Sequence, residues 1–361
     1  TAFRRLLSAS ILCQALLSCA QLSATEGVSE PHTLAPAHPP NSRYMGLRMR
    51  GSLRLKVGDD GRPHQLSGLA WDEDQQRLYA LSDDAYIVHL VPLFNNGMLS
   101  KTRLLAIYPL RDAAGAPLRG RDADSEGLHA RYTHNGERGD SELVVSFEQR
   151  PRIERYSATG VLLGGVALPP ALSRDDYAGS NQQLEAVTES SRYGLLTATE
   201  RPLRSGSQNS IAIYAVNGKQ RWHYPLRDRR HGAVVALEML NEDEVLVLER
   251  RFVSFWRPLT ISLSLGRLTT APNSLLAMTE IAHFESSRGW SLDNFEGLGR
   301  HRGRCYFMVS DDNRNPLQRT ILTYIEILPL HLNDTTARLP AAAASIQPGC
   351  TDGFDNRAGG R

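Results

Sequence analysis

The triplet Glu126-Gly127-Leu128 is one copy of a short pattern that recurs along this chain of 361 residues. Each copy has a small polar or acidic residue, then a small residue, then an aliphatic residue. Successive copies are spaced by roughly fifty residues or a little more, a period typical of repeat architectures. The other clear copies are Ser67-Gly68-Leu69, Glu185-Ala186-Val187 and Glu296-Gly297-Leu298, and a weaker copy lies near Ala236-Leu237-Glu238.

Each copy is followed by a second apolar run that ends in an acidic residue. Short runs of β-forming residues alternate with turn residues through most of the chain, and helical periodicity is almost absent. We therefore predict an all-β chain built from repeated four-stranded units. The second runs are Leu78 to Asp83, Leu143 to Glu148, Gly194 to Glu200, Glu244 to Glu249 and Cys305 to Asp311.

The number of strands predicts how the units close into a ring. The last unit has only three runs, which end with Ile321 to Leu328, and the run from Arg50 to Val57 could supply its missing strand. Four-stranded units closed by an N-terminal strand form a β-propeller, which leaves only short protected edges. We predict five blades, or six if residues 104–125 or 252–285 contain another.

The first 24 residues have the pattern of a secretory signal. The basic pair Arg4-Arg5 precedes the apolar stretch 6–17, which is too short and too interrupted to span a membrane. Leu16-Leu17-Ser18-Cys19 also resembles a bacterial lipobox, in which Cys19 would become the lipidated first residue. Ordinary cleavage at a nearby alanine is the alternative. We therefore expect an exported protein, either periplasmic or held at the outer membrane as a lipoprotein.

The segments that flank the repeats have a different composition. Residues 25–43 are rich in Pro, Ala, His and Ser and are predicted to be a flexible linker. Residues 333–361 are rich in Ala, Gly and Pro and are predicted to be a disordered tail, so the propeller should occupy 44–332. Cys305 and Cys350 could form a disulfide in an oxidising compartment, or Cys305 could be a buried thiol.

The overall composition excludes some classes of function. The chain is 41% hydrophobic and 22% charged with a formal net charge of +2, so nothing in the charge balance calls for nucleic acid. The sequence contains no GxSxG elbow, no HExxH helix and no GxxxxGK loop. A serine-nucleophile esterase therefore has no support in the sequence.

Propeller topology predicts where the repeated acids meet. The first strand of a blade lines the central channel and the second runs antiparallel beside it, so the start of one and the end of the other share an edge. Like charges gathered there need a hard divalent cation or guanidinium partners, and ion pairs that only lock the blades together are the simpler alternative. The acids are Glu126, Glu148, Glu185, Glu200, Glu249, Glu296 and Asp311, and arginines that follow such acids are Arg150, Arg201, Arg250, Arg251 and Arg314.

Other polar residues lie close to the starts of the first strands. The run Asp122 to Gly127 resembles the first half of a calcium loop, but Thr133 stands at the twelfth position and the EF-hand pattern fails. We expect this loop to add acids to the same rim. His64 and His231 precede first strands and could act as bases or ligands, although a lone histidine is more often a packing residue.

The ordered series of these segments resembles the phytase-like family, also described as having the esterase-like activity of phytase. The resemblance covers roughly residues 62–328, and it departs from a complete set of first-strand acids at Ser67 and in the fourth unit. The segments that carry it are Gln65–Trp71, Leu81–Asp84, Asp124–Leu128, Leu184–Ala186, Ala198–Pro202, Leu246–Arg250, Asn294–Leu298 and Val309–Asn313.

Together with the convergence of acids, this resemblance implies a β-propeller hydrolase of small-molecule phosphate esters or related esters. We expect a divalent metal, Ca²⁺, as cofactor, held by Glu126, Glu185, Glu296 and Asp311. Glu200 or Glu249 would be the general base, and Arg201 and Arg250 would orient the oxyanion. The alternative is a non-catalytic envelope propeller that binds a ligand or a partner protein.

Overall fold

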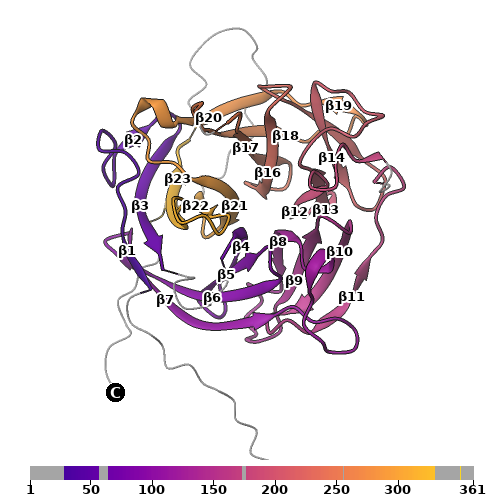
Figure 1. Ribbon diagram of the computed structural model, residues 1–361, viewed down its shortest axis with the longest axis horizontal. Coiled ribbons are helices and arrows are strands. Elements are labelled where there is room, and N and C mark those ends of the chain that lie inside the picture. Colours follow the sequence, from indigo (N-terminus) through magenta and orange to yellow (C-terminus); the bar gives the residue numbers. More distant parts are fainter. Residues whose placement is uncertain (1–27, 57–63, 173–175, 255, 330–349, 351–361) are drawn as a thin grey trace, which may run out of the picture.

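The computed structural model describes residues 28–56, 64–172, 176–254, 256–329 and 350. These residues form five small sheets set around a central axis, as Figure 1 shows. The all-β prediction and the prediction of a five-bladed propeller are both confirmed. The segments considered for a sixth blade contribute strands to the first, third and fourth blades instead.

In the first four blades the chain runs from the innermost strand outward. The first blade contains β4 (Leu66–Asp72), β5 (Arg77–Ser82), β6 (Tyr86–Asn95) and β7 (Met98–Pro109). The second contains β8 (Ser125–Arg131), β9 (Glu142–Phe147), β10 (Arg152–Ser157) and β11 (Leu162–Val166), and the 3₁₀ turn η1 (Gly120–Asp122) precedes it.

The third and fourth blades share one short strand. The third contains β12 (Leu184–Ser190), β13 (Gly194–Thr199), β14 (Ser210–Ala215) and β15 (Arg221–Pro225). The fourth contains β16 (Gly232–Met239), β17 (Glu244–Arg251), β18 (Thr260–Arg267) and β20 (Met278–Glu285), with the 3₁₀ turn η3 (Ser286–Arg288) after it. Between β18 and β20, β19 (Ser274–Leu275) pairs in parallel with β15 at the outer edge of the third blade.

The fifth blade is completed by the N-terminal part of the chain. It contains β21 (Asn294–Arg300), β22 (Cys305–Asp311), β23 (Ile321–Ile327) and then β3 (Leu47–Leu55), which pairs antiparallel with β23. The short strands β1 (Ser29–Pro31) and β2 (Arg43–Tyr44) both pair with β3. The prediction that a run beginning near Arg50 closes the ring is therefore supported, and the strand begins three residues earlier.

The structure corrects the predicted linker over residues 28–43. Val28, Leu34 and Ala35 are buried, and β1 forms the outer edge of the fifth blade. The segment has no apolar period because it makes no long strand, but a few apolar side chains are enough to anchor an extended chain to an existing sheet. The signal, the lipobox at Cys19 and most of the predicted tail lie outside the described residues.

Cys305 and Cys350 form a disulfide, with their Cα atoms 5.8 Å apart. The bond attaches Cys350 to the second strand of the fifth blade, where Cys305 is fully buried. Within the described part of the chain, no helix has the length and apolar character needed to cross a bilayer.

The small residue of each repeat allows the innermost strands to pack closely at the axis. A Cβ atom placed on Gly127 would lie 2.7 Å from the carbonyl oxygen of Glu185 and 2.7 Å from the amide nitrogen of Val187. One placed on Gly68 would lie 2.7 Å from the Cβ of Leu128. The innermost strands enclose a space of about 10 Å³, which is lined by Ser67 and by small and aliphatic residues of the repeats. Closely packed residues of the innermost strands, most of them small or aliphatic, therefore close the axis of the propeller.

Candidate functional site

Every innermost strand has a β-bulge at the first residue of the repeat. Pairing with the second strand skips one or two residues in each blade, and a bulge of this kind redirects the side chain of the unpaired residue. The residues at the bulge are Ser67, Glu126, Glu185, Val235 and Glu296.

This register corrects the weak fourth copy of the repeat. The fourth copy is Val235-Ala236-Leu237, one residue earlier than the sequence pattern suggested. Glu238 is not part of the central site, because its carboxylate accepts hydrogen bonds from Thr188 Oγ1 and from the amide nitrogens of Met239 and Arg300.

The ends of the second strands place one more residue per blade at the same edge. Ser82, Thr199 and Ser310 pair with the residue before the bulge, and the next residue is Asp83, Glu200 or Asp311. Glu148 has the corresponding place in the second blade, where its amide bonds to the carbonyl of Asp124. In the fourth blade Glu249 pairs with Val234, so the corresponding residue is Arg250.

The expectation that Glu249 joins the channel mouth is therefore wrong. Successive side chains of a strand point to opposite faces, so an offset of one residue exchanges Glu249 for Arg250. The carboxylate of Glu249 instead accepts a hydrogen bond of 2.6 Å from the Tyr224 hydroxyl. The fourth blade thus brings an aliphatic residue and a cation to the positions where other blades bring acids.

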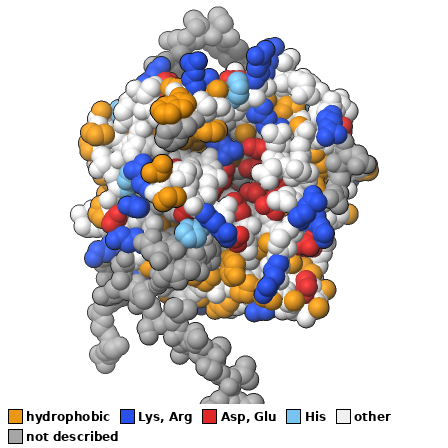
Figure 2. Space-filling view, in the orientation of Figure 1, with side chains coloured by type: hydrophobic (Ala, Val, Ile, Leu, Met, Phe, Trp, Pro, Cys, Tyr) orange, Lys and Arg blue, Asp and Glu red, His pale blue; other side chains and the backbone are white. Residues whose placement is uncertain are grey.

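We call the resulting group of side chains the acidic ring. Figure 2 shows acidic side chains gathered in a hollow at the centre of this face, with basic side chains at its margin. Most of them are less than a tenth exposed, although they come from four blades. The carboxylates of the ring are Asp83, Asp124, Glu126, Glu148, Glu185, Glu200, Glu296 and Asp311.

Arg250 is the cation of the acidic ring. Its Nη1 donates to Glu296 and, over 2.5 Å, to Asn294 Oδ1, and its Nη2 donates over 3.0 Å to Glu200 Oε1. Burial opposes the charge on the guanidinium, but Glu296, Glu200 and Glu185 raise the pKa of Arg250 above its usual value. Arg250 therefore remains charged and neutralises one side of the ring.

The rest of the ring has an excess of negative charge. Burial, followed by repulsion from neighbouring carboxylates, raises the pKa of Asp83, Glu126 and Glu185 well above their usual range. Burial likewise raises the pKa of Glu148 and of Asp311 to about 8, and repulsion from Glu200 and Glu296 respectively adds to it. Without a cation, the ring must therefore retain protons at neutral pH.

Two groups of acids have the spacing required for a metal ion. In each group, one oxygen per residue lies within 4.8 Å of the others: Asp83, Glu296 and Asp311 form the first, and Asp124, Glu126 and Glu148 the second. The Oδ1 atom of Asp83 is buried and has no hydrogen-bond partner among the described residues. A set of carboxylate oxygens with an unsatisfied buried member fits a hard divalent cation such as Ca²⁺.

The structure brings together Glu126, Glu185, Glu200, Arg250, Glu296 and Asp311 from the sequence hypothesis. Asp83 and Asp124 were not among the predicted site residues. The signal for Asp83 was already present, because it ends the second strand of its blade as Glu200 does. Asp124 lies in the loop that was expected to add acids to the rim.

Arg201 does not enter the acidic ring. Its guanidinium donates to backbone carbonyls at the start of the fourth blade. Nη1 donates to the carbonyl of Gly232 over 2.5 Å, and Nη2 donates to the carbonyl of Arg230. The remaining predicted residues pair with acids outside the acidic ring, namely Arg150 with Asp122, Arg251 with Asp228, Arg314 with Asp84, His64 with Asp312 and His231 with Asp228.

Comparison with known proteins identifies one family. A family model described as phytase-like, "Esterase-like activity of phytase", matches residues 63–314, which include the whole acidic ring. No curated protein matches the chain.

Solved structures resemble the chain only distantly. The structure of U3-55K has a TM-score of 0.39 and 10% identity, and the alignment covers 73% of this chain and 97% of that one. The WD40 repeats of RRP9 have a TM-score of 0.38 and 10% identity, covering 82% and 100%. Raptor from Chaetomium thermophilum has a TM-score of 0.38 and 12% identity, covering 86% and 29%. Similarities of this degree carry no argument about function.

Proposed function

Because the chain belongs to the phytase-like family, we propose that its acidic ring hydrolyses phosphate esters or related esters with the help of a divalent cation, Ca²⁺. The observation that carries this proposal is the convergence of buried carboxylates from four blades, with Arg250 as their charged partner. Ion pairs that only lock blades would give each acid its own guanidinium. Of the six acids in the groups around Asp83 and Glu126, Glu296 pairs with Arg250, and the other five form no ion pair with an arginine among the described residues.

The proposed ligands of the cation are Asp83, Glu296 and Asp311, with Asp124, Glu126 and Glu148 as the second group. Glu185 belongs to neither group, and burial together with repulsion from carboxylates that include Glu148 and Glu296 raises its pKa. A bound divalent cation would polarise the phosphoryl or acyl oxygen and would favour the deprotonated form of an attacking water.

Two residues of the chain complete the proposed chemistry. Arg250 is held between Glu296 and Glu200, so its positive charge is fixed in the acidic ring. There it would stabilise a developing oxyanion. Glu200 is the proposed general base, because its carboxylate lies at the same mouth and is oriented by Arg250. Glu249 and Arg201 are no longer candidates, since Glu249 is bonded to Tyr224 of the third blade and Arg201 to the backbone at the start of the fourth.

The test is an assay of phosphomonoester and carboxylic-ester hydrolysis by the purified chain, with and without a chelator. We expect turnover that chelation abolishes and that Glu185→Gln lowers at least tenfold, because the substitution removes one negative charge from the centre of the ring. Turnover that is equal in the variant and insensitive to the chelator would contradict the proposal.

The matched control is Glu137→Gln, which makes the same chemical change in an exposed loop between β8 and β9. This loop lies at the opposite edge of the second blade, so we expect turnover within a factor of two of the parent. If no ester is hydrolysed while calcium still binds, the chain is instead a non-catalytic propeller, which is the alternative function.

The proposal includes export. The disulfide between Cys305 and Cys350 supports it, because disulfides persist in oxidising compartments. The mass of the mature protein from its source cell tests the expectation. A chain that begins at Cys19 with added acyl mass supports the lipoprotein, and cleavage at a nearby alanine supports a periplasmic protein. An uncleaved chain contradicts export.

A further inference from the structure

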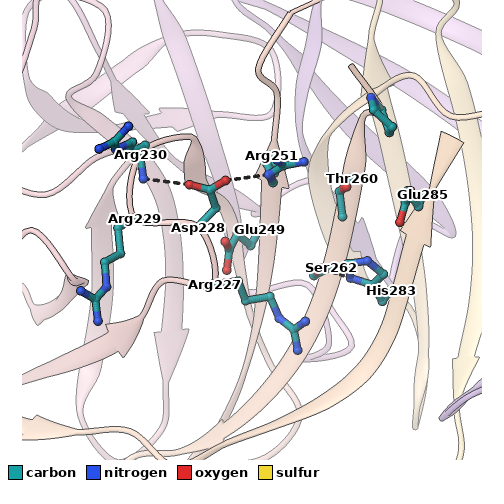
Figure 3. Close-up of a pocket in the computed structure, with 11 residues that line it drawn as sticks. Arg227, Asp228, Arg229, Arg230, Glu249, Arg251, Thr260, Ser262, His283 and Glu285 are labelled. Atoms are coloured by element: carbon teal, nitrogen blue, oxygen red, sulfur yellow. Dashed lines mark hydrogen bonds and ion pairs between the residues drawn. The ribbon is translucent and has the colours of Figure 1, made fainter. Parts of the chain in front are cut away.

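A cavity of about 610 Å³ lies on the fourth blade, beside the acidic ring. Arginines from two segments line it: Arg227, Arg229 and Arg230 precede β16, and Arg251 ends β17. Figure 3 shows Arg227 and Arg251 near Glu249, across from side chains of β18 and β20, whereas Arg229 and Arg230 extend to the other side. We call this cavity the arginine pocket.

The pocket and the ring are built from consecutive residues of one strand. Arg250 and Arg251 are neighbours in β17, so their side chains point to opposite sides of the sheet. Arg250 enters the ring, and Arg251 enters the pocket. The two sites therefore have separate side chains, and a substitution in the pocket does not alter the ring directly.

The loop that carries the arginines is held in place by hydrogen bonds. Arg201 donates to the carbonyls of Arg230 and Gly232, and the amide of Gly232 donates to the carbonyl of Asp228 over 2.8 Å. The carboxylate of Asp228 accepts hydrogen bonds from the amide nitrogens of Arg230 and His231, over 2.9 Å and 3.1 Å. This loop is thus preorganised, which lowers the entropic cost of binding a ligand.

The arginines that line the pocket outnumber its acids: they are Arg227, Arg229, Arg230 and Arg251, and the acids are Asp228, Glu249 and Glu285. Asp228 is paired with Arg251 over 2.7 Å, and Glu280 is paired with Arg227 over 2.9 Å. Arg251 donates to Asp228 through Nε. The two terminal nitrogens of Arg251 make no hydrogen bond to the described residues. Burial raises the pKa of Glu249, which also lines the pocket, despite its hydrogen bond from the Tyr224 hydroxyl.

The wall opposite the arginines supplies hydroxyl and imidazole groups and one acid, Glu285 of β20, which pairs with Arg288 over 3.3 Å. Thr260 and Ser262 of β18 and His283 of β20 line it, and Ser262 Oγ lies 3.0 Å from His283 Nδ1. Guanidinium groups facing hydroxyl and imidazole groups are the combination that binds phosphate and carboxylate groups with several hydrogen bonds.

We propose that the arginine pocket binds the oxyanion group, phosphate or carboxylate, of a small organic molecule. The site goes beyond the proposed reaction, because its residues would bind such a group whether or not the acidic ring hydrolyses an ester. Its volume is within the range of small-molecule sites.

The test is calorimetric titration of the full chain with inorganic phosphate and, separately, with acetate, in the presence of a chelator. The chelator removes any cation from the acidic ring, so that phosphate cannot bind there through a metal. We expect saturable binding near one equivalent for at least one of the two anions. Binding of phosphate alone identifies a phosphate ligand, and binding of acetate identifies a carboxylate ligand. The absence of binding by both anions overturns the proposal.

Variants locate the site. We expect the double variant Arg227→Gln, Arg251→Gln to bind at least tenfold more weakly, because each charge-assisted hydrogen bond contributes strongly. Arg267→Gln is the matched control: it removes one positive charge from β18 of the same blade, at an exposed side chain that does not line the cavity, and we expect less than a threefold loss. If the double variant unfolds, Arg227→Lys keeps the charge but loses the planar guanidinium, and we expect a fivefold loss or more.

Glu185→Gln separates this proposal from the proposed hydrolysis. It alters only the acidic ring, and we expect its affinity for the anion to be unchanged. Affinity that falls in Glu185→Gln, or that is equal in the parent and the arginine variants, would assign the anion to the ring and overturn the proposal.

Discussion

At the scale of single residues, Arg250 decides the charge balance of the site. Its guanidinium contacts Glu296, Asn294 and Glu200, which come from two other blades. Because a buried ion pair that loses one partner leaves an uncompensated charge, the contribution of Arg250 should appear as stability of the fold.

We expect Arg250→Ala to lower the free energy of unfolding by about 3–5 kcal/mol at pH 8 in a chelator. Arg267→Ala is the control, because Arg267 also lies on the fourth blade and pairs with a glutamate, but its side chain is 67% exposed. Its cost should be below about 1 kcal/mol. Urea unfolding measures both, and equal losses would show that Arg250 has no special place in the ring.

At the scale of strands, the recurring bulge and the small residue after it place the acids. The bulge turns Glu126, Glu185 and Glu296 toward the axis, and the small residue allows the neighbouring blade to approach. Gly127 also donates its amide to Ser146 Oγ over 2.9 Å. A larger residue at this point must push two blades apart.

We expect Gly127→Ala to destabilise the fold by about 1–3 kcal/mol, because the new methyl group would meet backbone atoms of β12 that cannot move separately. Gly165→Ala is the matched control on β11, since a Cβ there meets nothing within 4 Å. Its effect should lie within about 0.5 kcal/mol. Thermal and urea unfolding compare the two, and a neutral Gly127→Ala would contradict close packing at the axis.

At the scale of the whole molecule, ring closure forces acids from four blades into one small volume. The pKa of Glu148 and Asp311 rises to about 8 in the folded chain, above the ordinary value that applies when the chain is unfolded. An acid whose pKa is raised by folding stabilises the folded chain at low pH. This stabilisation is lost as the pH rises through the pKa that the acid has in the folded chain. Groups with lowered pKa act in the opposite sense: Glu73 and Glu189 do so below about pH 4, and the buried histidines His89 and His301 below about pH 6.5. The acids of the ring with raised pKa outnumber these two histidines, so the acids set the sign.

We therefore expect the metal-free protein to have a lower Tm at pH 8.5 than at pH 5.5. Millimolar Ca²⁺ should raise the Tm at pH 8.5 more than at pH 5.5, because the cation binds only the folded chain and competes with protons. Calorimetric or fluorescence melts with and without chelator measure this. A Tm that rises with pH in the presence of the chelator would contradict the proposed cation site. A Tm that does not change on addition of Ca²⁺ at either pH would also contradict it.

Much of this arrangement was predictable from the chain. The triplet beginning at Glu126 and the acids ending the second runs indicated repeated blades, closure by an N-terminal strand and convergence of acids at one edge. These inferences hold because the alternation of side chains along a strand and the antiparallel pairing of consecutive strands depend on residues that are close in the sequence. The fourth blade was misaligned, because Val235 and Arg250 carry no acidic signal and Glu249, one residue away, does.

The sequence by itself determined the all-β class and the edge at which the acids gather, and it favoured five blades over six, since each follows from a repeat whose copies are visible along the chain. Only the tertiary structure decided that Arg250 rather than Glu249 faces the acidic ring, that Arg201 holds a backbone loop, and that β1 adds an outer edge to the fifth blade. The physical reason is register. A single bulge or an offset of one residue reverses the face to which a side chain points, and register is set by pairing between strands distant in the sequence.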